Sequence, residues 1–504
     1  MRMVKSLLLG SAAGLVAVAG AQAADLPVKA KPVEYVRVCS LYGAGFWYVP
    51  GTDTCLKIGS YVREQVEYNA GAGGIPIGFG ANDQALAGRF DRTDTSQLSM
   101  RTRASISVDL RTQTEYGTLR SYLEGGFQTS ANNGSAPGND VVYFDRGFIQ
   151  FAGLTAGRIR SYFDINSMAP YSYLNTRVSG DTGALGLWGI AYTAQFGNGL
   201  SATLSLEDGG STSQGNSHGQ SSSRGHGIVN LSMVNQFGLG TESFDNEGWK
   251  MPDVVGALRI DQAWGYAQIA AALHDASGGY YQTGGTGLAT GIQNNGHPGD
   301  EFGWAVTGGF TLNNVLGLKG DQFGMQAVYT EGASGYATRA TGPFQIYSSG
   351  NSAGFGWITD GVFTTGNSIE LTTAWGINGF YQHFWNPKWR TSIHGGYEEV
   401  DYSGTAKTMF CPAGAGTAAP SGVAMAGVTN CNPDFSWWEL GSRTQWNPHP
   451  DLDIGVDVVW EHLNTAFGGT ATLAANGARP GGTYQIQDQD SVSVYFRIQR
   501  NFLP

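Results

Sequence analysis

Long apolar segments are missing from this chain once its first residues are set aside. A membrane-crossing helix needs about 18 or more consecutive apolar residues, so helical membrane spans are excluded. Charged residues make up only 14% of the 504 residues and no basic cluster occurs, which argues against binding to nucleic acid. No Cys-x-x-Cys or His-x-x-x-His pair is present, so the sequence contains no zinc motif.

The first 23 residues are predicted to be a secretory signal peptide. Arg2 and Lys5 supply a short basic region, residues 7–19 are apolar, and residues 21–23 read Ala-Gln-Ala, a small-x-small cleavage site. The alternative, a membrane anchor, is disfavoured because the apolar stretch is short and no stop-transfer signal follows. We therefore expect an exported chain that begins at Ala24.

Alternation of apolar and polar residues is the main positive signal. Successive side chains of a strand point to opposite faces, so an alternating segment has one apolar and one polar face. The last segment shows this pattern, with Val492, Val494, Phe496, Ile498 and Phe502 on one face and Ser491, Ser493, Tyr495, Arg497 and Gln499 on the other. Residues 101–111 and 452–462 repeat it, which predicts a chain built from such strands.

Short turns and long polar connections alternate between the strand-like segments, as is typical of outer-membrane barrels. The long connections are residues 69–96, 131–140, 162–186, 208–251, 275–301, 332–368, 401–434 and 464–489. Sixteen strands are predicted between them, at 56–68, 98–111, 118–128, 141–151, 154–160, 187–196, 200–206, 254–261, 264–274, 302–311, 323–331, 369–385, 389–400, 435–446, 452–462 and 492–502.

The predicted fold is all-β: a sixteen-stranded antiparallel transmembrane β-barrel with long external loops and short periplasmic turns. We assign residues 1–23 to the signal peptide, 24–54 to a periplasmic N-terminal segment and 55–504 to the barrel. An eighteen-stranded barrel is the main competitor, because residues 227–237 are apolar enough to form an additional strand. A β-sandwich stays open as well, since alternation alone does not separate a lipid-facing surface from a core.

The four cysteines fall into two local pairs. Cys39 and Cys55 flank the segment before the first strand, and Cys411 and Cys431 flank a run rich in Gly, Ala, Pro and Thr. In an oxidising compartment this spacing predicts two disulfides that close local loops. Four buried thiols are the alternative, and the loop composition disfavours it.

A basic wall is predicted on the first strands. If alternation is followed through them, six basic side chains face the lumen: Lys57, Arg63, Arg101, Arg103, Arg111 and Arg120. Like charges facing hydrocarbon would be costly, whereas in an aqueous channel they stay hydrated and create a transverse field. Asp164 and Asp181, in the third long loop, would face these arginines if that loop folds inward. The alternative is a solvated polar face with no role.

Two Gly-x-Ser-x-Gly matches, centred on Ser217 and Ser352, lie in Gly/Ser-rich loops. A nucleophile elbow needs a buried strand before the serine and a helix after it, so neither match predicts catalysis.

Three segments resemble the porin family of alphaproteobacteria. The first begins Ala-Asp-Leu-Pro-Val-Lys at Ala24 and runs through both early cysteines to Arg63. The second, from Arg146 to Arg158, is similar to the stretch before that family's constriction loop, and Tyr495 to Phe502 resembles its terminal strand. Because the segments lie at both ends and in the middle, the resemblance covers essentially the whole chain.

The resemblance implies a trimeric general porin of sixteen strands, located in the outer membrane with its lipid and lipopolysaccharide, whose third loop folds into the lumen. It implies no enzyme activity and no cofactor. One departure is that Leu503-Pro504 follow Phe502, where the family usually ends on Phe.

The function we predict is passive diffusion of small hydrophilic solutes and ions through each barrel, with no nucleic-acid partner. A substrate-selective channel, for example for sugars, would need an aromatic track along the lumen, for which Trp264, Tyr266 and Trp437 are the candidates. Two more functions stay open at this point: a surface adhesin or receptor that uses the long loops, and a soluble secreted enzyme.

Overall fold

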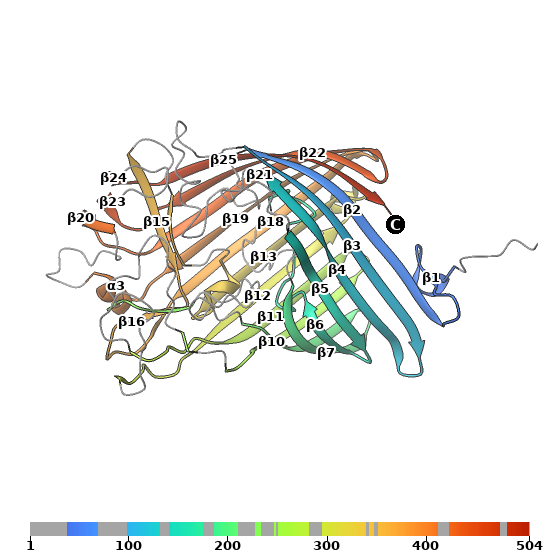
Figure 1. The fold of residues 1–504 in the computed structure, drawn as a ribbon, viewed down its shortest axis with the longest axis horizontal. Helices are drawn as coiled ribbons and strands as arrows, with labels where there is room; N and C mark the ends of the chain where they lie inside the picture. Colours follow the sequence, from blue (N-terminus) through green and yellow to red (C-terminus); the bar gives the residue numbers. More distant parts are fainter. Residues whose placement is uncertain are drawn as a thin grey trace, which may run out of the picture.

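Sixteen strands form a closed antiparallel barrel in the computed structural model (Figure 1), which describes residues 38–68, 98–131, 141–174, 186–209, 227–232, 246–247, 250–281, 295–338, 342–346, 351–411, 423–473 and 481–502. Around the barrel they are β2 (Thr54–Tyr68), β3 (Leu98–Thr114), β4 (Gly117–Ala131), β5 (Val141–Phe151), β6 (Leu154–Ile159), β7 (Leu187–Gly197), β8 (Leu200–Glu207), β10 (Asp253–Gln262), β11 (Gly265–Asp275), β12 (Phe302–Asn313), β13 (Gln322–Glu331), β18 (Thr373–Asn386), β19 (Trp389–Asp401), β21 (Phe435–His449), β22 (Leu452–Asn464) and β25 (Gln489–Phe502).

Closure of the barrel comes from pairing of the first and last strands. β2 pairs with β3 on one side and with β25 on the other, where Val66 lies opposite Phe496. The predicted sixteen-stranded barrel is confirmed. Because every strand has two neighbours, the backbone polar groups of the spanning segments are satisfied within the wall.

The alternation predicted from the sequence decides which face each side chain takes. On β25, Val492, Phe496 and Ile498 are exposed on the outer surface, whereas Ser493 and Arg497 are buried on the inner side. The outer surface is therefore an apolar belt of the kind that faces lipid.

The eighteen-stranded alternative is wrong. Within residues 227–237, the structure describes only the first six, and of these Ile228–Asn230 form the short strand β9. β9 pairs with β16 (Gly361–Phe363) in a separate sheet that also contains β17 (Glu370–Leu371). This sheet joins the fourth and sixth long loops and leaves the barrel wall unchanged.

The two ends of the barrel differ in their connections. At the short-turn end, β1 (Trp47–Tyr48) pairs with β2, and the preceding chain includes a short 3-10 helix, η1 (Ser40–Tyr42). The Cys39–Cys55 disulfide joins this segment to β2. The second disulfide, between Cys411 and Cys431, belongs to the seventh long loop instead. Another 3-10 turn, η3 (Val315–Gly317), lies between β12 and β13.

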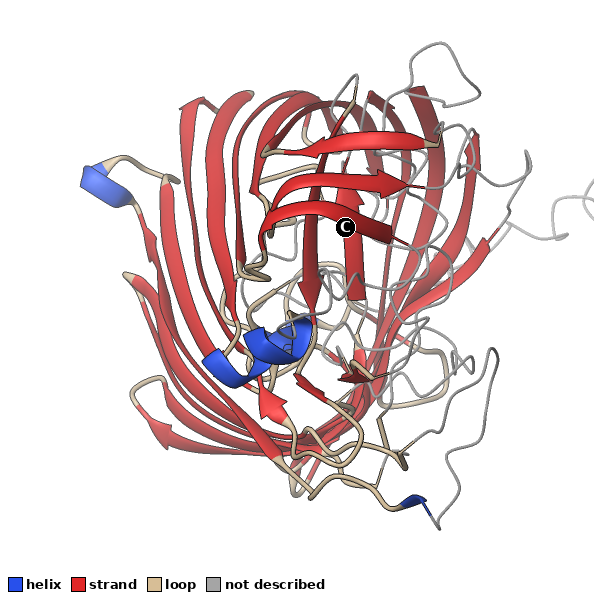
Figure 2. Cartoon of the chain, turned by 90° about the vertical axis from the view of Figure 1, so that its left-hand side faces the viewer, coloured by secondary structure: helices blue, strands red, loops and turns tan. Residues whose placement is uncertain are grey.

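The long-loop end carries additional structure (Figure 2). A five-stranded sheet is built from β14 (Gly342–Ile346), β15 (Ser352–Ile358), β24 (Gly482–Ile486), β23 (Gly468–Leu473) and β20 (Val423–Asn430), which come from the sixth, seventh and eighth long loops. The 3-10 helix η4 (Ser334–Tyr336) and the helix α3 (Gly404–Phe410) also lie here. None of the described helices is long and apolar enough to cross a membrane.

Candidate pore constriction

The third long loop, between β6 and β7, lies inside the barrel. Asn166 carries the first anchor: its side-chain amide donates to the carbonyl oxygens of Phe310 (3.3 Å) and Met325 (3.1 Å), on β12 and β13. Further along, the ring of Tyr171 stacks on Phe380 of β18, with ring centroids 3.5 Å apart. The loop therefore follows the inner wall, as the family resemblance implies.

The last described part of this loop is fixed to β21, β22 and β25. The Tyr173 backbone N–H and the Ser172 hydroxyl donate to the Asp457 carboxylate at 2.6 and 2.9 Å. Arg497 donates to the Tyr173 carbonyl oxygen (3.1 Å) and lies 4.0 Å from the centroid of its ring. Arg443 donates to the carbonyl oxygen of the nearby Pro170. Hydrogen bonds to charged groups are stronger than neutral ones, so this end of the loop is firmly held.

The basic residues predicted on the first strands all have the parity of the inner face. The register places Arg63 opposite Arg103, Gln65 opposite Arg101, and Arg111 opposite Arg120. Lys57 lies opposite Asp109 in the same pairing of β2 with β3. The six side chains are thus on one continuous wall formed by β2, β3 and β4.

Most of these cations have a carboxylate partner. Arg101 pairs with Glu67 at 3.5 Å, and Arg103 pairs with Asp145 at 3.1 Å. Asp109 accepts from two arginines, Arg111 at 2.7 Å and Arg120 at 2.9 Å. Glu67 was not predicted from the sequence, although it has the inward parity, because a single carboxylate among polar neighbours carries no distinctive motif. Asp145 is the additional residue of a β-bulge between Phe144 and Arg146, so alternation along β5 does not place it.

Arg63 and Arg497 are different. Arg63 donates to Gln499 (2.8 Å) and lies 4.7 Å from the ring centroid of Tyr61, while Arg497 donates to Gln65 (2.7 Å). Within the described residues, no carboxylate lies at salt-bridge distance from either guanidinium. The positive charge of this part of the wall, where β25 meets β2, is therefore not neutralised by direct ion pairs.

Arg497 and Arg443 were missing from the predicted wall. The signal for Arg497 was available, because it alternates with the outward Phe496 and Ile498 of β25, whereas Arg443 of β21 is flanked by the polar Ser442 and Thr444. The contacts of these two arginines could not be predicted from the sequence, since they depend on the pairing of β25 with β2 and on the path of the third loop.

The structure places Asp164 beside an arginine of its own loop. Its carboxylate pairs with Arg160 of the same loop at 3.4 Å, and its side chain is fully buried. Gln268 of β11 donates to the carbonyl oxygens of Tyr162 (2.8 Å) and Asp164 (3.5 Å). These bonds hold this part of the loop against β11. Asp181 lies outside the described residues, so the predicted roles of Asp164 and Asp181 opposite the basic wall stay predictions.

A closed antiparallel barrel with an apolar outer surface, a charged inner wall and a long loop folded against that wall defines a class of protein, the outer-membrane channels. Family membership agrees: the chain belongs to the family described as the Porin subfamily, whose model matches residues 25–495. The protein is thus a multi-pass protein of the bacterial outer membrane.

Known relatives match part of the chain. It is 36% identical over 268 residues to the porin Omp2b of Brucella suis, an alignment that covers 52% of this chain and 64% of that protein. Omp2b of Brucella abortus (strain 2308) is 35% identical over 269 residues, with 52% and 63% covered. The match thus spans less than two thirds of these relatives. Among solved structures, the outer-membrane channel DcaP of Acinetobacter baumannii has a TM-score of 0.54 at 14% identity, covering 90% of this chain and 99% of that one, which shows a shared fold.

Proposed function

We propose that the protein forms a passive diffusion pore for small hydrophilic solutes and ions, and acts as a channel rather than an enzyme. The observation that carries this proposal is the pairing of an apolar outer surface with a charged inner wall on the same strands. On β3, Ile106 is exposed on the outside, while Arg101, Arg103 and Arg111 lie on the inside. Charges in this position need water beside them, and water in the lumen is a path for solutes.

The basic wall is proposed to set the selectivity. Ion pairs neutralise part of its charge, but Arg63 and Arg497 have no carboxylate partner among the described residues. The low-dielectric wall of the barrel concentrates the electric field of these two guanidinium groups in the lumen. We therefore propose a preference for anions, which decreases at high salt because the Debye length falls from about 10 Å at 0.1 M to about 3 Å at 1 M.

A homotrimer in contact with outer-membrane lipid and lipopolysaccharide is the proposed assembly. Glu64 supports contact between copies, because its parity in β2 is outward. The register places it between Ile498 and Thr102, and the Thr102 hydroxyl donates to its carboxylate. A carboxylate facing hydrocarbon is destabilising, and a neighbouring subunit would cover it.

The proposed orientation has the long loops outside the cell and the short turns in the periplasm. The N-terminal segment, residues 24–54, would then lie in the periplasm after removal of the signal peptide. The uneven lengths of the two sets of connections support this orientation.

A sugar-selective channel is not favoured by the geometry. Of the three candidate aromatics, Trp437 is buried, Tyr266 donates to Asn166 of the third loop at 3.1 Å, and Trp264 lies in the turn between β10 and β11. They do not form a track along an open lumen.

Liposome swelling tests the proposal. Proteoliposomes containing the purified protein should swell in iso-osmotic solutions of small sugars at rates that fall with solute size. Swelling no faster than in protein-free liposomes would favour the adhesin function instead.

A further inference from the structure

On one side of the barrel, the inner wall carries a group of small apolar side chains among its polar residues. The register aligns Val255, Ala272 and Ala305 across β10, β11 and β12, with the parity that faces the lumen. The inward residues of five neighbouring strands in this region are at most 8% exposed: Val255, Ala257, Ala270, Ala272, Ala305, Val328 and Ala374. A wall in contact with channel water would expose such side chains, so another part of the chain covers them.

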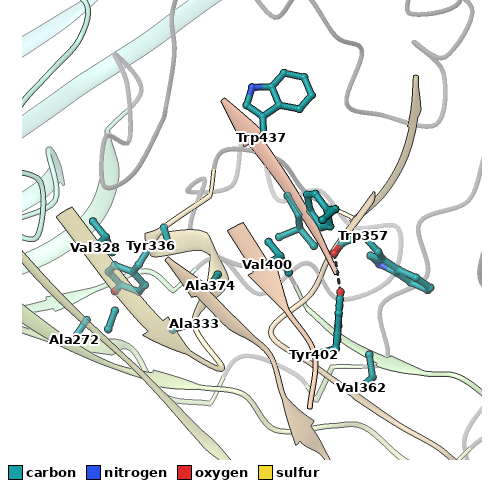
Figure 3. Close-up of a cluster of buried hydrophobic side chains, with 14 of the residues drawn as sticks. Ala272, Val328, Ala333, Tyr336, Trp357, Val362, Ala374, Val400, Tyr402 and Trp437 are labelled. Carbon is teal, nitrogen blue, oxygen red and sulfur yellow. Dashed lines mark hydrogen bonds between the residues drawn. The ribbon is translucent and has the colours of Figure 1, made fainter. Parts of the chain in front are cut away.

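The sixth long loop, between β13 and β18, provides most of this cover. Figure 3 shows Tyr336 of this loop beside Val328 and Ala272 of the wall. The Tyr336 ring also packs edge-on against Phe163 of the third loop, with centroids 4.6 Å apart. We call the covering segments of this loop, residues 333–337 and 357–362, the lumen insert. Its buried apolar members are Ala333, Tyr336, Ala337, Trp357, Ile358 and Val362.

The insert extends across to β19, β21 and β22. Val400, Trp437 and Leu463, which face inward on those strands, belong to the same buried cluster. Tyr402, from the seventh loop, donates its hydroxyl to the Trp357 carbonyl oxygen at 2.6 Å (Figure 3). The long-loop half of the barrel is thus filled along the wall from β10 to β22.

A buried polar network fixes the insert to the wall. Asp360 accepts from the Ser334 backbone N–H (2.7 Å) and hydroxyl (2.8 Å), and its other oxygen lies 3.4 Å from His274 of β11. Asp253 of β10 accepts from Tyr336 at 2.6 Å and lies 2.8 Å from His274. All five residues are at most 5% exposed. A connected buried network of this kind specifies one arrangement, so the insert is a fixed part of the lumen.

The opposite wall differs in the polarity of its side chains. β2 to β4 carry the arginines, and their inward residues at this half are polar: Gln65, Glu67, Ser99, Arg101 and Ser130 are at most 8% exposed, and Gln128 is half-buried. At the long-loop half, the lumen therefore has one side packed with apolar side chains and one side lined by polar and charged groups.

We infer that the lumen insert is a second constriction element, which excludes water and solutes from the β10–β22 side and confines the conducting path to the arginine wall. This inference rests on the proposed pore function. The sixth loop then contributes to selectivity, because it leaves a solute no route through the lumen that avoids the arginines.

Cysteine accessibility tests directly whether the β10–β22 side is dry. Ala272→Cys and Ala305→Cys place a thiol under the insert, and Gln128→Cys is the matched control on the charged wall, at a similar distance from the long-loop end of its strand. The native cysteines are disulfide-bonded and give no background. With a small water-soluble thiosulfonate on folded protein, Gln128→Cys should react at least roughly tenfold faster than the two buried thiols. Equal rates at all three positions would overturn the inference.

Removal of the insert tests its effect on conduction. Glu331 and Thr373 are paired across β13 and β18, so residues 332–372 can be replaced by a short Gly-Ser turn that closes the hairpin. Conductance should rise roughly twofold, the change expected if a path of similar width opens beside the first, and anion preference should fall. Replacing residues 469–485 of the external sheet by the same turn is the control and should change neither property.

The two results separate this inference from the proposed function. If the wild-type protein does not conduct, the pore proposal fails, and the cysteine rates still decide whether this side is dry. If the 332–372 variant folds, as judged by heat-modifiable migration, and conducts as the wild type does, the insert confines nothing. If it does not fold, the cysteine rates alone decide.

Discussion

Replacing Arg101 and Arg103 with serine should move the pore towards cations. Both guanidinium groups are paired, Arg101 with Glu67 and Arg103 with Asp145. The double variant therefore removes two positive charges and also leaves two carboxylates without these partners on the same wall. The lumen becomes wider at this level as well, because two long side chains are shortened.

The size of the effect follows from Coulomb's law. A unit charge acts on an ion about 7 Å away with about 0.6 kcal/mol in water. Losing two such charges lowers the energy of a cation by about 1.2 kcal/mol and raises that of an anion by about the same amount, a difference of about 2.4 kcal/mol. Since about 1.4 kcal/mol is a tenfold change, the cation-to-anion permeability ratio should rise roughly fiftyfold at low ionic strength. The shift should shrink as salt is raised through 1 M, where the Debye length is about 3 Å.

The assay is the reversal potential of single channels in a salt gradient at low ionic strength. Arg259→Ser is the matched control, because Arg259 is also a lumen-facing arginine with an acidic partner, Asp261 at 2.8 Å, but lies on β10. The control should shift the reversal potential less. If the double variant leaves both conductance and reversal potential at wild-type values, these arginines do not line the narrow part of the pore, and the assignment of the constriction to this wall is refuted.

Three further predictions concern orientation and stability. In whole cells, Thr405→Cys on α3 should react with an impermeant thiol reagent and Lys388→Cys, in the turn after β18, should not until the outer membrane is opened; the reverse pattern would invert the proposed orientation. Reduction of both disulfides should leave the barrel folded, because its hydrogen-bonded ladder does not depend on them, and loss of heat-modifiable migration on reduction would contradict this. Asp321, in the turn before β13, is a stabilising acceptor: burial alone would raise its pKa, but hydrogen bonds from His383, Tyr381 and the Phe384 backbone lower the pKa below its ordinary value. The contribution of Asp321 to folding stability is therefore complete above the ordinary pKa of about 3.9 and is lost as pH falls through the folded-state pKa. Asp321→Asn should lower the free energy of unfolding by about 1–3 kcal/mol at neutral pH, which gels would show as a lower unfolding temperature.

The barrel was predictable because its signal is local. The alternation from Ser491 to Phe502 gives the face of each residue without any knowledge of its neighbours. The same parity placed Arg101, Arg103 and Arg120 on the inner face. Strand number followed from the turns, and it was ambiguous only at residues 227–237, where an apolar run pairs with β16 of another loop instead of the wall.

The interior of the lumen was not predictable in the same way. Alternation says that Val255, Ala272 and Ala305 face inward, but it does not say what covers them. Their cover depends on contacts between segments far apart in the chain, such as Tyr336 with Asp253. Asp164 shows the same limit, because its partner Arg160 and its anchor Gln268 depend on the path of a loop with no repeating pattern.

The most direct test of the pore function is single-channel recording of the purified wild-type protein in planar bilayers. We expect stable, stepwise conductance increments and, in a salt gradient, a reversal potential that indicates anion preference and approaches zero preference at high salt. Absence of increments from protein that shows the heat-modifiable migration of a folded barrel would contradict the claim that this barrel is an open pore.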